Sequence, residues 1–471
     1  MGQGHAIVVD VGKTLSKVSL WSREGHCLDR RTRPNVAQAA DPYVPLDTAG
    51  VREWLVETLH SFAGHPVEAI VPVAHGAAVA GIRDGVLAFV PPDYEGELPA
   101  NQLAAYRAGR DPFALTGSPA LPAGLNLGAQ LHRLETLGAL EGAMLLPYAQ
   151  YWAWWLSGVA VSEVSSLGCH SDLWSPAAGA FSPMAVARGW ADKFAPLARA
   201  GEAIGTLRPE LAARTGLPAT ARVYAGLHDS NAALLAARGF REIAGREATV
   251  LSTGTWFIAM RLPAALIDTT TLPEARDCLV NVDVFGQPVP SARFMGGREI
   301  EAVIGIDTRR VDIVPDQPQL LAAVPPVLAD GTMLLPTLAP GCGPFPDRTA
   351  RWLAEPGDWY QRRAAMCLYA ALVADASLDL IGSREVLLVE GRFAEAEVFV
   401  RALAALRPDT AVHTANAHND VSFGALRLID PGLTPQGELR RVAPLDGDLA
   451  RYRDTWRTAI DTASPDEADT A

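Results

Sequence analysis

The sequence predicts an α/β protein with two domains, and three observations support this prediction. The chain has 471 residues, of which 49% are hydrophobic, and a single hydrophobic core stops growing near ~250–300 residues. Strand-like runs come first and then alternate with helical patterns, which is typical of α/β domains. A strand, a polar turn with a glycine and another strand occur near the start of each half, as a duplicated domain would show.

The first half opens on a predicted β-hairpin. The apolar residues 6–9 and the strand-like residues 18–21 flank a polar turn that contains Gly12. A third strand is expected through 28–33, a helix near 49–62 and a buried strand at 69–73.

The second half repeats this order with different residues. Predicted strands at 248–251 and 256–260 flank a turn with the sequence STGT. The domain boundary is expected near 239–245, which divides the chain into residues 1–238, residues 239–440 and a C-terminal segment, 441–471. Further expected elements are a helix over 362–381, a strand at 385–389, a helix over 394–406, a surface helix at 448–460 and a disordered tail from residue 463.

Composition excludes several classes of partner. The net charge of −13 disfavours nucleic acid, because binding to a phosphate backbone requires a basic face. The five cysteines show no ligand spacing and no export signal is recognisable, so we expect a protein of the reducing cytoplasm. Residues 142–162 carry no charge, but Pro147 and Gly158 interrupt them, and they predict a buried helix at 151–156 and no membrane partner.

The first turn has the chemistry of a phosphate-binding loop. Gly12 lets backbone N–H groups approach an anion, Thr14 and Ser16 add hydroxyl donors, and Lys13 or Lys17 supplies positive charge. The turn is not a Walker A loop, because a strand follows it instead of a helix. An ordinary polar hairpin turn is the alternative, and the second turn, 252–255, has the same two interpretations.

An aspartate stands before a predicted helix at the end of the first half. Residues 226–229 (GLHD) lead into a helix at 231–237. Asp229 is either a helix N-cap or, because it lies where two domains meet, a base that accepts a proton during phosphoryl transfer. His228 is either a hydrogen-bond partner of a sugar or a core histidine.

Two further glycines lie where a nucleotide could bind. Gly297 opens an apparent helix and Gly391 follows a strand, and both positions suit an anion or a structural turn equally. No GxGxxG or GxSxG motif occurs, so neither a dinucleotide cofactor nor a serine hydrolase is expected.

The order of these motifs resembles the FGGY family of carbohydrate kinases over residues 5–435. The family's first phosphate motif is similar to residues 10–17 (DVGKTLSK), its GxHD segment to 226–229 and its second phosphate motif to 252–256 (STGTW). Residues 294–299 (FMGGRE) are similar to the rhamnulokinase- and fuculokinase-like branch.

The resemblance implies two ribonuclease H-like domains of the actin and hexokinase-like ATPase type with an interdomain cleft. The first domain would bind mainly sugar and the second mainly ATP, with Mg²⁺, and Asp229 would be the general base. The implied metal-site residues are Asp10 and Asp229. The implied ATP contacts are Gly12, Lys13, Thr14, Lys17, Thr253, Gly254, Thr255, Gly297 and Gly391, and the implied sugar contacts are His75, Gly76, Asp93, Tyr94, Gln130, His170 and His228.

Three departures from the family pattern leave the substrate open. Lys13 stands where a small residue or threonine is usual, residues 91–96 lack the usual Trp-x-Asp-x-Arg pattern, and residues 390–393 are poor in glycine. The first choice is a deoxyketohexose such as L-rhamnulose or L-fuculose, and the alternative is a pentulose or polyol, namely xylulose, ribulose or glycerol. An actin-like ATPase or sugar-responsive regulator, which transfers nothing, is a different class. Family members are often dimers, so a homodimer is one expected assembly.

Overall fold

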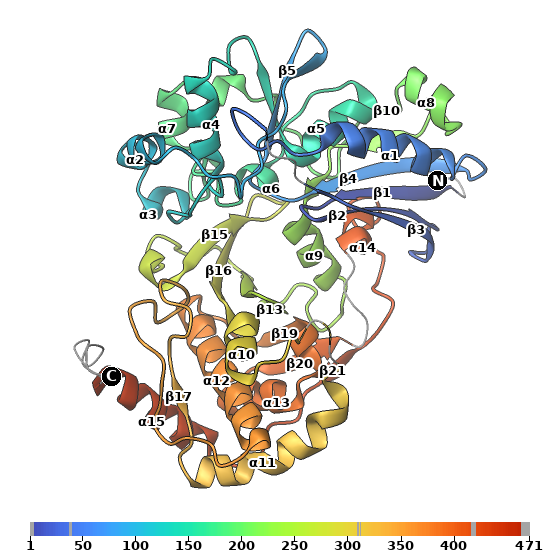
Figure 1. The fold of residues 1–471 in the computed structure, drawn as a ribbon. Coiled ribbons are helices and arrows are strands. Elements are labelled where there is room, and N and C mark those ends of the chain that lie inside the picture. Colours follow the sequence, from blue (N-terminus) through green and yellow to red (C-terminus); the bar gives the residue numbers. More distant parts are fainter. Residues whose placement is uncertain (1–3, 37–39, 309, 311, 416–420, 463–471) are drawn as a thin grey trace.

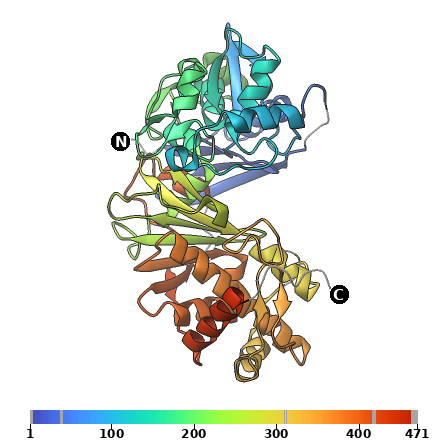
Figure 2. The same cartoon turned by 90° about the vertical axis from the view of Figure 1, so that its left-hand side faces the viewer.

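The computed structural model describes residues 4–36, 40–308, 310, 312–415 and 421–462, and it folds into two α/β domains (Figures 1 and 2). The first lies at the top of Figure 1 and the second at the bottom. The expected disordered tail from residue 463 lies outside the described residues.

The first domain is built on a sheet with the strand order β10-β11-β4-β1-β2-β3. β1 pairs with β2 in antiparallel and with β4 in parallel orientation, and the short β12 continues along the end of β4. The strands are β1 (His5–Val11), β2 (Leu15–Trp21), β3 (Cys27–Pro34), β4 (Val67–Ala74), β10 (Ala203–Thr206), β11 (Arg222–Tyr224) and β12 (Leu227–His228). The predicted hairpin and the two following strands are confirmed.

The second sheet has the order β15-β16-β14-β13-β19-β20-β21. The same strand directions occur in both sheets: the order β16-β14-β13-β19-β20 matches β3-β2-β1-β4-β11 strand by strand. The two sheets therefore share one topology, and the predicted duplication is confirmed. The strands are β13 (Ala248–Thr253), β14 (Phe257–Leu262), β15 (Cys278–Val282), β16 (Pro288–Phe294), β19 (Val386–Gly391), β20 (Ala411–Ala415) and β21 (Leu439–Arg441).

Helices and smaller strands cover the first sheet and extend its domain upward in Figure 1. The helices are α1 (Thr48–His60), α2 (Ala100–Ala108), α3 (Phe113–Thr116), α4 (Leu127–Thr136), α5 (Tyr148–Ser157), α6 (Val164–Leu167), α7 (Pro183–Ala187), α8 (Pro209–Thr215) and α9 (Asp229–Ala237). The strands are β5 (Val79–Arg83), β6 (Val86–Phe89), β7 (Met144–Pro147), β8 (Trp174–Ser175) and β9 (Ala180–Phe181). α5 contains the predicted buried helix, and Tyr151 and Trp152 lie fully inside the core. Among the described helices, none is long and apolar enough to cross a bilayer.

The second domain packs around α12, in which residues 363–378 are all buried. Its helices are α10 (Gly296–Ile304), α11 (Gln317–Ala329), α12 (Trp359–Leu380), α13 (Glu397–Leu406) and α15 (Leu449–Thr462), and its short strands are β17 (Leu334–Leu335) and β18 (Arg351–Trp352). The expected surface helix is confirmed as α15, most of whose residues are at least partly exposed, while its Trp456 is fully buried and donates to the Leu334 carbonyl oxygen at 2.8 Å. The reason is an apolar stripe at helical spacing, which ends with Trp456 and Ile460.

One helix crosses back between the domains. α14 (Val421–Leu426) lies in the range expected for the second domain, but it packs side by side with α9 against β1 and β4 (Figure 1). Its Phe423 shares an apolar cluster with Val8 and Trp21 of the first sheet. A Cβ on Gly424 would lie 1.7 Å from the Ala232 carbonyl oxygen, so the two helix backbones touch. The helix that begins at Asp229 thus packs on both the first sheet and α14.

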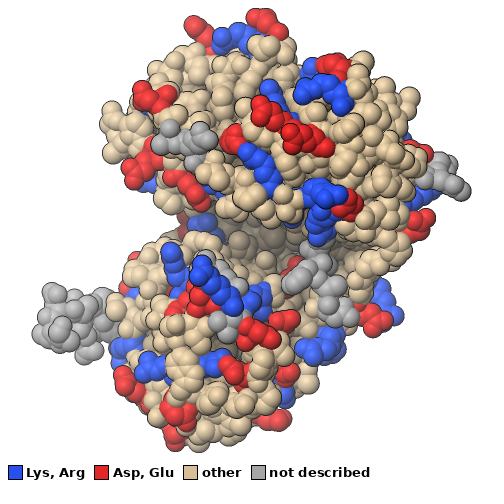
Figure 3. Space-filling view, turned by 45° about the vertical axis from the view of Figure 1, so that its right-hand side comes forward, with Lys and Arg blue, Asp and Glu red and all other residues tan. Residues whose placement is uncertain are grey.

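The domains also meet at β15. The Val280 N–H donates to the Gly117 carbonyl oxygen at 2.8 Å, and Glu274 accepts from the Ala120 N–H at 2.9 Å. The molecular surface is deeply hollowed where the two domains face each other (Figure 3).

Candidate active site

The GLHD segment is placed by its pairing with the central strand of the first sheet. Leu227 and His228 pair with Val73 and Ala74 at the carboxyl end of β4. Gly226 has φ +77°, and a Cβ there would lie 2.1 Å from the Pro72 carbonyl oxygen, so only glycine fits. This pairing places His228 and Asp229 next to the residues that follow β4, His75 and Gly76. A Cβ on Gly76 would meet His228 Nε2 at 2.9 Å.

Asp229 is the first residue of α9, and His228 occupies the cap position. Asp229 Oδ1 accepts from the Ser230 N–H at 2.6 Å and lies 3.1 Å from His228 Nε2. The Asp229 side chain is 32% exposed and that of His228 only 6%. The Asp229 carboxylate is therefore accessible to solvent, whereas the neighbouring His228 side chain is buried.

Asp10 lies within electrostatic reach of Asp229. Burial raises the pKa of Asp10 to about 6, and the Asp229 carboxylate adds to the rise, whereas Lys17 opposes it. The Lys17 ammonium lies 2.7 Å from Asp10 Oδ2, across the β1–β2 ladder. Lys17 therefore forms an ion pair with Asp10.

The turn between β1 and β2 is tight and braced from β3. The Gly12 N–H donates to the Leu15 carbonyl oxygen at 3.1 Å. Asn35 donates to the Gly12 carbonyl oxygen at 2.8 Å, and its backbone N–H donates to the Thr14 carbonyl oxygen at the same distance. Thr14 itself is exposed, while Lys13 turns away from Asp10 and pairs with Asp93. Sequence reasoning missed Asn35, since nothing in the motif points to a residue so far along the chain.

The predicted ATP contacts of the second domain form one cluster. Gly297, at the start of α10, packs so closely on the turn that a Cβ would lie 2.0 Å from the Gly254 carbonyl oxygen. Gly391 has φ +81°, and its Cβ would lie 2.2 Å from the Thr253 carbonyl oxygen. Thr253 Oγ1 accepts from the Phe393 N–H at 3.0 Å. The Arg298 N–H donates to the Thr255 carbonyl oxygen at 3.4 Å.

The hydroxyl proton of Thr253 is also taken. Thr253 Oγ1 donates to the Glu390 carbonyl oxygen, so this side chain ties β13 to β19. The Thr253 hydroxyl is therefore engaged within the fold, which leaves the backbone of the turn as the part that could bind a phosphate.

Several predicted sugar contacts surround His75. Its ring packs 5.4 Å from the Tyr94 ring and 4.9 Å from the Tyr148 ring, centroid to centroid. Burial lowers the pKa of His75 and of His228, so both imidazoles are neutral at pH 7. Tyr148 was not predicted, although its place at the start of an aromatic run was a usable signal.

Two other predicted sugar contacts are engaged with the backbone. Gln130 donates to the Ala77 and Gly124 carbonyl oxygens at 2.6 Å each, which leaves only its buried Oε1 without a partner among the described residues. His170 Nδ1 bonds the Leu125 carbonyl oxygen at 2.8 Å, and burial lowers the pKa of His170 to about 4.

A buried carboxyl group behind the site escaped the sequence analysis. Glu163 Oε2 accepts from Ser165 Oγ at 2.6 Å, and that Oγ accepts from the His228 N–H at 3.2 Å. Glu163 also accepts the backbone N–H groups of Ser165 and Ser166 at the start of α6. An acidic residue followed by serines is a recognisable capping pattern.

Glu163 gives the fold a specific pH dependence. Burial raises its pKa from an ordinary 4.5 to about 7, so the folded state holds a proton that the unfolded state releases. This contribution to the free energy of unfolding is complete below pH 4.5 and is lost as the pH rises through 7, by up to ~3 kcal/mol. Urea unfolding between pH 5 and 8 should show a steeper decline for the wild type than for Glu163→Gln, and parallel curves would contradict this.

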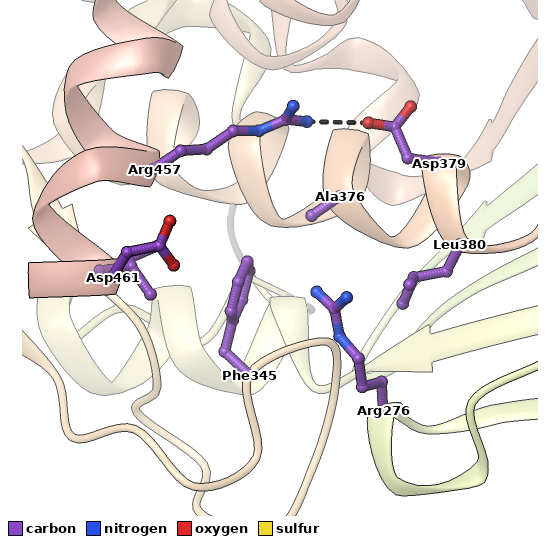
Figure 4. A pocket seen from close by; sticks show the side chains of 8 residues that line it. Arg276, Phe345, Ala376, Asp379, Leu380, Arg457 and Asp461 are labelled. Carbon is purple, nitrogen blue, oxygen red and sulfur yellow. Dashed lines mark hydrogen bonds and ion pairs between the residues drawn. The ribbon is translucent and has the colours of Figure 1, made fainter. Parts of the chain in front are cut away.

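A separate pocket of 320 Å³ lies on the second domain between α12 and α15 (Figure 4). Arg457 bonds Asp379 at its rim, and Arg276 stacks over the Phe345 ring, 5.4 Å from its centroid. None of the predicted site residues lines it. The candidate active site is therefore the region between the two turns, not this pocket.

Two carboxylates of the site, those of Asp10 and Asp229, are candidates for holding a metal ion. No group of three or more His, Cys, Asp or Glu side chains suited to a metal occurs in the part of the chain that the structure describes. Mg²⁺ in phosphoryl-transfer enzymes takes one or two carboxylates and the phosphates of the substrate. The carboxylates of Asp10 and Asp229 interact electrostatically, and as a pair they fit this requirement.

The comparisons with known proteins agree with this geometry. Residues 245–436 match the C-terminal domain of the FGGY carbohydrate kinases. A carbohydrate kinase from Novosphingobium aromaticivorans is 64% identical, with a TM-score of 0.96 over 98% of this chain and 100% of that one. No curated protein matches the sequence.

More distant structures share the fold. A xylulose kinase from Rhodospirillum rubrum is 18% identical, with a TM-score of 0.75 over 97% of this chain and 98% of that one. A glycerol kinase from Plasmodium falciparum is 11% identical, with a TM-score of 0.76 over 97% and 98%. The predicted pair of ribonuclease H-like domains is confirmed.

Proposed function

The chain belongs to the FGGY family of carbohydrate kinases, and from this premise we propose that it transfers the γ-phosphoryl group of ATP to a hydroxyl of a ketose, with Asp229 as the general base. One observation carries the proposal: Asp229 presents a partly exposed carboxylate from a buried wall, beside Asp10 and the turn between β1 and β2.

Each part of the site has a task in this reaction. Phosphoryl transfer depends mainly on positioning and on stabilisation of charge on the transferred group. The β1–β2 turn, from the first domain, and the β13–β14 turn with the start of α10, from the second, offer backbone N–H groups for phosphates. Asp229 accepts the proton of the attacking hydroxyl. Asp10 and Asp229 would hold Mg²⁺, which supplies positive charge next to the phosphates.

The neutral histidines suit a sugar acceptor. His228 Nδ1 is buried without a hydrogen-bond partner among the described residues, and such an atom calls for a water or a ligand. Neutral imidazoles both donate and accept, as hydroxyl groups require. His75 and Tyr94 would complete the wall along one side of the sugar.

The identity of the sugar rests on the motif resemblance. Residues 294–299 favour a deoxyketohexose such as L-rhamnulose or L-fuculose. The distant structures are named as xylulose, gluconate and glycerol kinases, and at 11–18% identity they support the fold alone. Xylulose, ribulose and glycerol therefore remain the alternative acceptors.

All five cysteines are free, which suits the cytoplasm, where ATP is supplied.

ADP release measured over a panel of acceptors tests the proposal. We expect Mg²⁺-dependent ADP formation to require a ketose, with L-rhamnulose and L-fuculose ahead of xylulose, ribulose and glycerol. Equal ADP release with and without any acceptor would instead favour the actin-like ATPase. Turnover with glycerol alone would overturn the ketose assignment but leave the kinase reaction standing.

A further inference from the structure

The two lysines of the first turn point to different partners. Lys17 pairs with Asp10 inside the hairpin, at 2.7 Å. Lys13 instead pairs with Asp93, 80 residues further along the chain, and its ammonium lies 3.5 Å from Glu95 Oε2. The same ammonium stands 5.3 Å from the centroid of the Tyr94 ring. Lys13 thus contacts three successive residues of the loop 91–96.

This loop is itself firmly held. The Asp93 N–H donates to the Val44 carbonyl oxygen at 2.8 Å, and Asp93 Oδ1 accepts from the Glu95 N–H at 2.9 Å. The Tyr94 carbonyl oxygen accepts from the Gly124 N–H at 2.9 Å. Asp93 Oδ2 is left for Lys13. Since the Tyr94 ring packs on His75, the loop forms part of the wall beside Asp229.

Burial makes the pair difficult to separate. The side chains of Lys13 and Asp93 are 15% and 3% exposed. If Lys13 moved to a phosphate, it would leave the Asp93 carboxylate buried without its cation, which is strongly unfavourable.

We infer that Lys13 is a positioning residue of the acceptor site, which ties the first phosphate turn to the loop 91–96 and orients Asp93 toward the sugar. The inference rests on the proposed function, because it assumes an acceptor next to Asp229. The Asp93 carboxylate that Lys13 holds offers hydrogen-bond acceptors for the hydroxyls of a neutral sugar. Glu95 and Asp229 add negative charge, so an anionic acceptor such as an aldonate is disfavoured.

Steady-state kinetics of Lys13→Met, Lys13→Arg and Asp93→Asn test this inference. Loss of one partner of a buried charge pair should raise the KM for the sugar by about 30-fold or more, while the KM for ATP stays within about twofold. Lys13→Arg keeps the charge and should recover most of the loss. The double variant Lys13→Met with Asp93→Asn should lose less than the product of the two single losses, because both residues act through one pair.

Lys193→Met is the matched control. Lys193 is the third lysine of the chain and donates to the Leu140 carbonyl oxygen at 3.2 Å, outside the site. This variant should leave both KM values unchanged.

A binding measurement keeps the inference testable without turnover. Calorimetric titration of ADP into the wild type and Lys13→Met should give equal Kd values, and weaker binding of ADP to the variant would overturn the inference. A fall in Tm with both KM values unchanged would overturn it as well, because Lys13 would then be a purely structural brace. If the wild type phosphorylates no acceptor, the proposed function fails, and the ADP titration still decides whether Lys13 serves the nucleotide.

Discussion

Replacement of Asp229 by asparagine is expected to lower kcat by about 10²–10⁴, the range typical of general acid–base catalysis. Asparagine keeps the size and the hydrogen bond from the Ser230 N–H, but it cannot accept the proton of the attacking hydroxyl. The KM values for ATP and sugar should change little. Initial rates at saturating substrates, with ADP release as the readout, measure the effect.

Asp358→Asn is a suitable control for this variant. Asp358 caps α12 by accepting from the Gln361 N–H at 2.9 Å, and it is not one of the proposed site residues. Loss of its charge should cost about 1 kcal/mol of stability at most and leave kcat unchanged. Normal turnover of Asp229→Asn would mean that Asp229 is only a helix-terminal residue.

Gly297→Ala is expected to weaken the ATP site strongly. The new methyl group would lie 2.0 Å from the Gly254 carbonyl oxygen and 2.9 Å from the Gly254 carbonyl carbon, both backbone atoms that cannot rotate away. Overpacking of this kind costs about 1–3 kcal/mol, so displacement of the turn should raise the KM for ATP about tenfold or lower the Tm by several degrees. ATP-dependent initial rates and a thermal melt measure the two quantities.

Gly64→Ala is the matched control for the glycine replacement. A Cβ at Gly64 would meet no atom within 4 Å, so the added methyl group should change neither the KM for ATP nor the Tm. If Gly297→Ala also left the KM for ATP and the Tm unchanged, α10 would not pack as closely on the second turn as the structure indicates.

The sequence predicted those features that depend on neighbouring residues. The hairpin of β1 and β2, the strand β4 and the helix α12 follow from apolar runs and turn residues that lie close together in the chain. The similarity of the two halves was also visible, because each begins with a strand, a glycine turn and a strand. The pairing of β12 with β4 then brings the GLHD segment to His75, as a parallel sheet requires.

Local sequence patterns could not predict contacts between segments that lie far apart in the chain. Asp93 lies 80 residues from Lys13, and no spacing rule connects the two. α14 was assigned to the second domain by its place in the chain, yet Phe423 and Gly424 fit only against the first domain and α9. The amide of Gln130 looked available for a sugar, and only the fold shows that two carbonyl oxygens engage it.

A crystal structure with Mg²⁺, a non-hydrolysable ATP analogue and the preferred sugar tests the central claim most directly. The account predicts an Asp229 carboxylate oxygen within ~3 Å of the acceptor hydroxyl, with that hydroxyl oxygen in line with the γ-phosphorus. An Asp229 side chain that contacts neither the sugar nor the metal, with another group next to the hydroxyl, would contradict it.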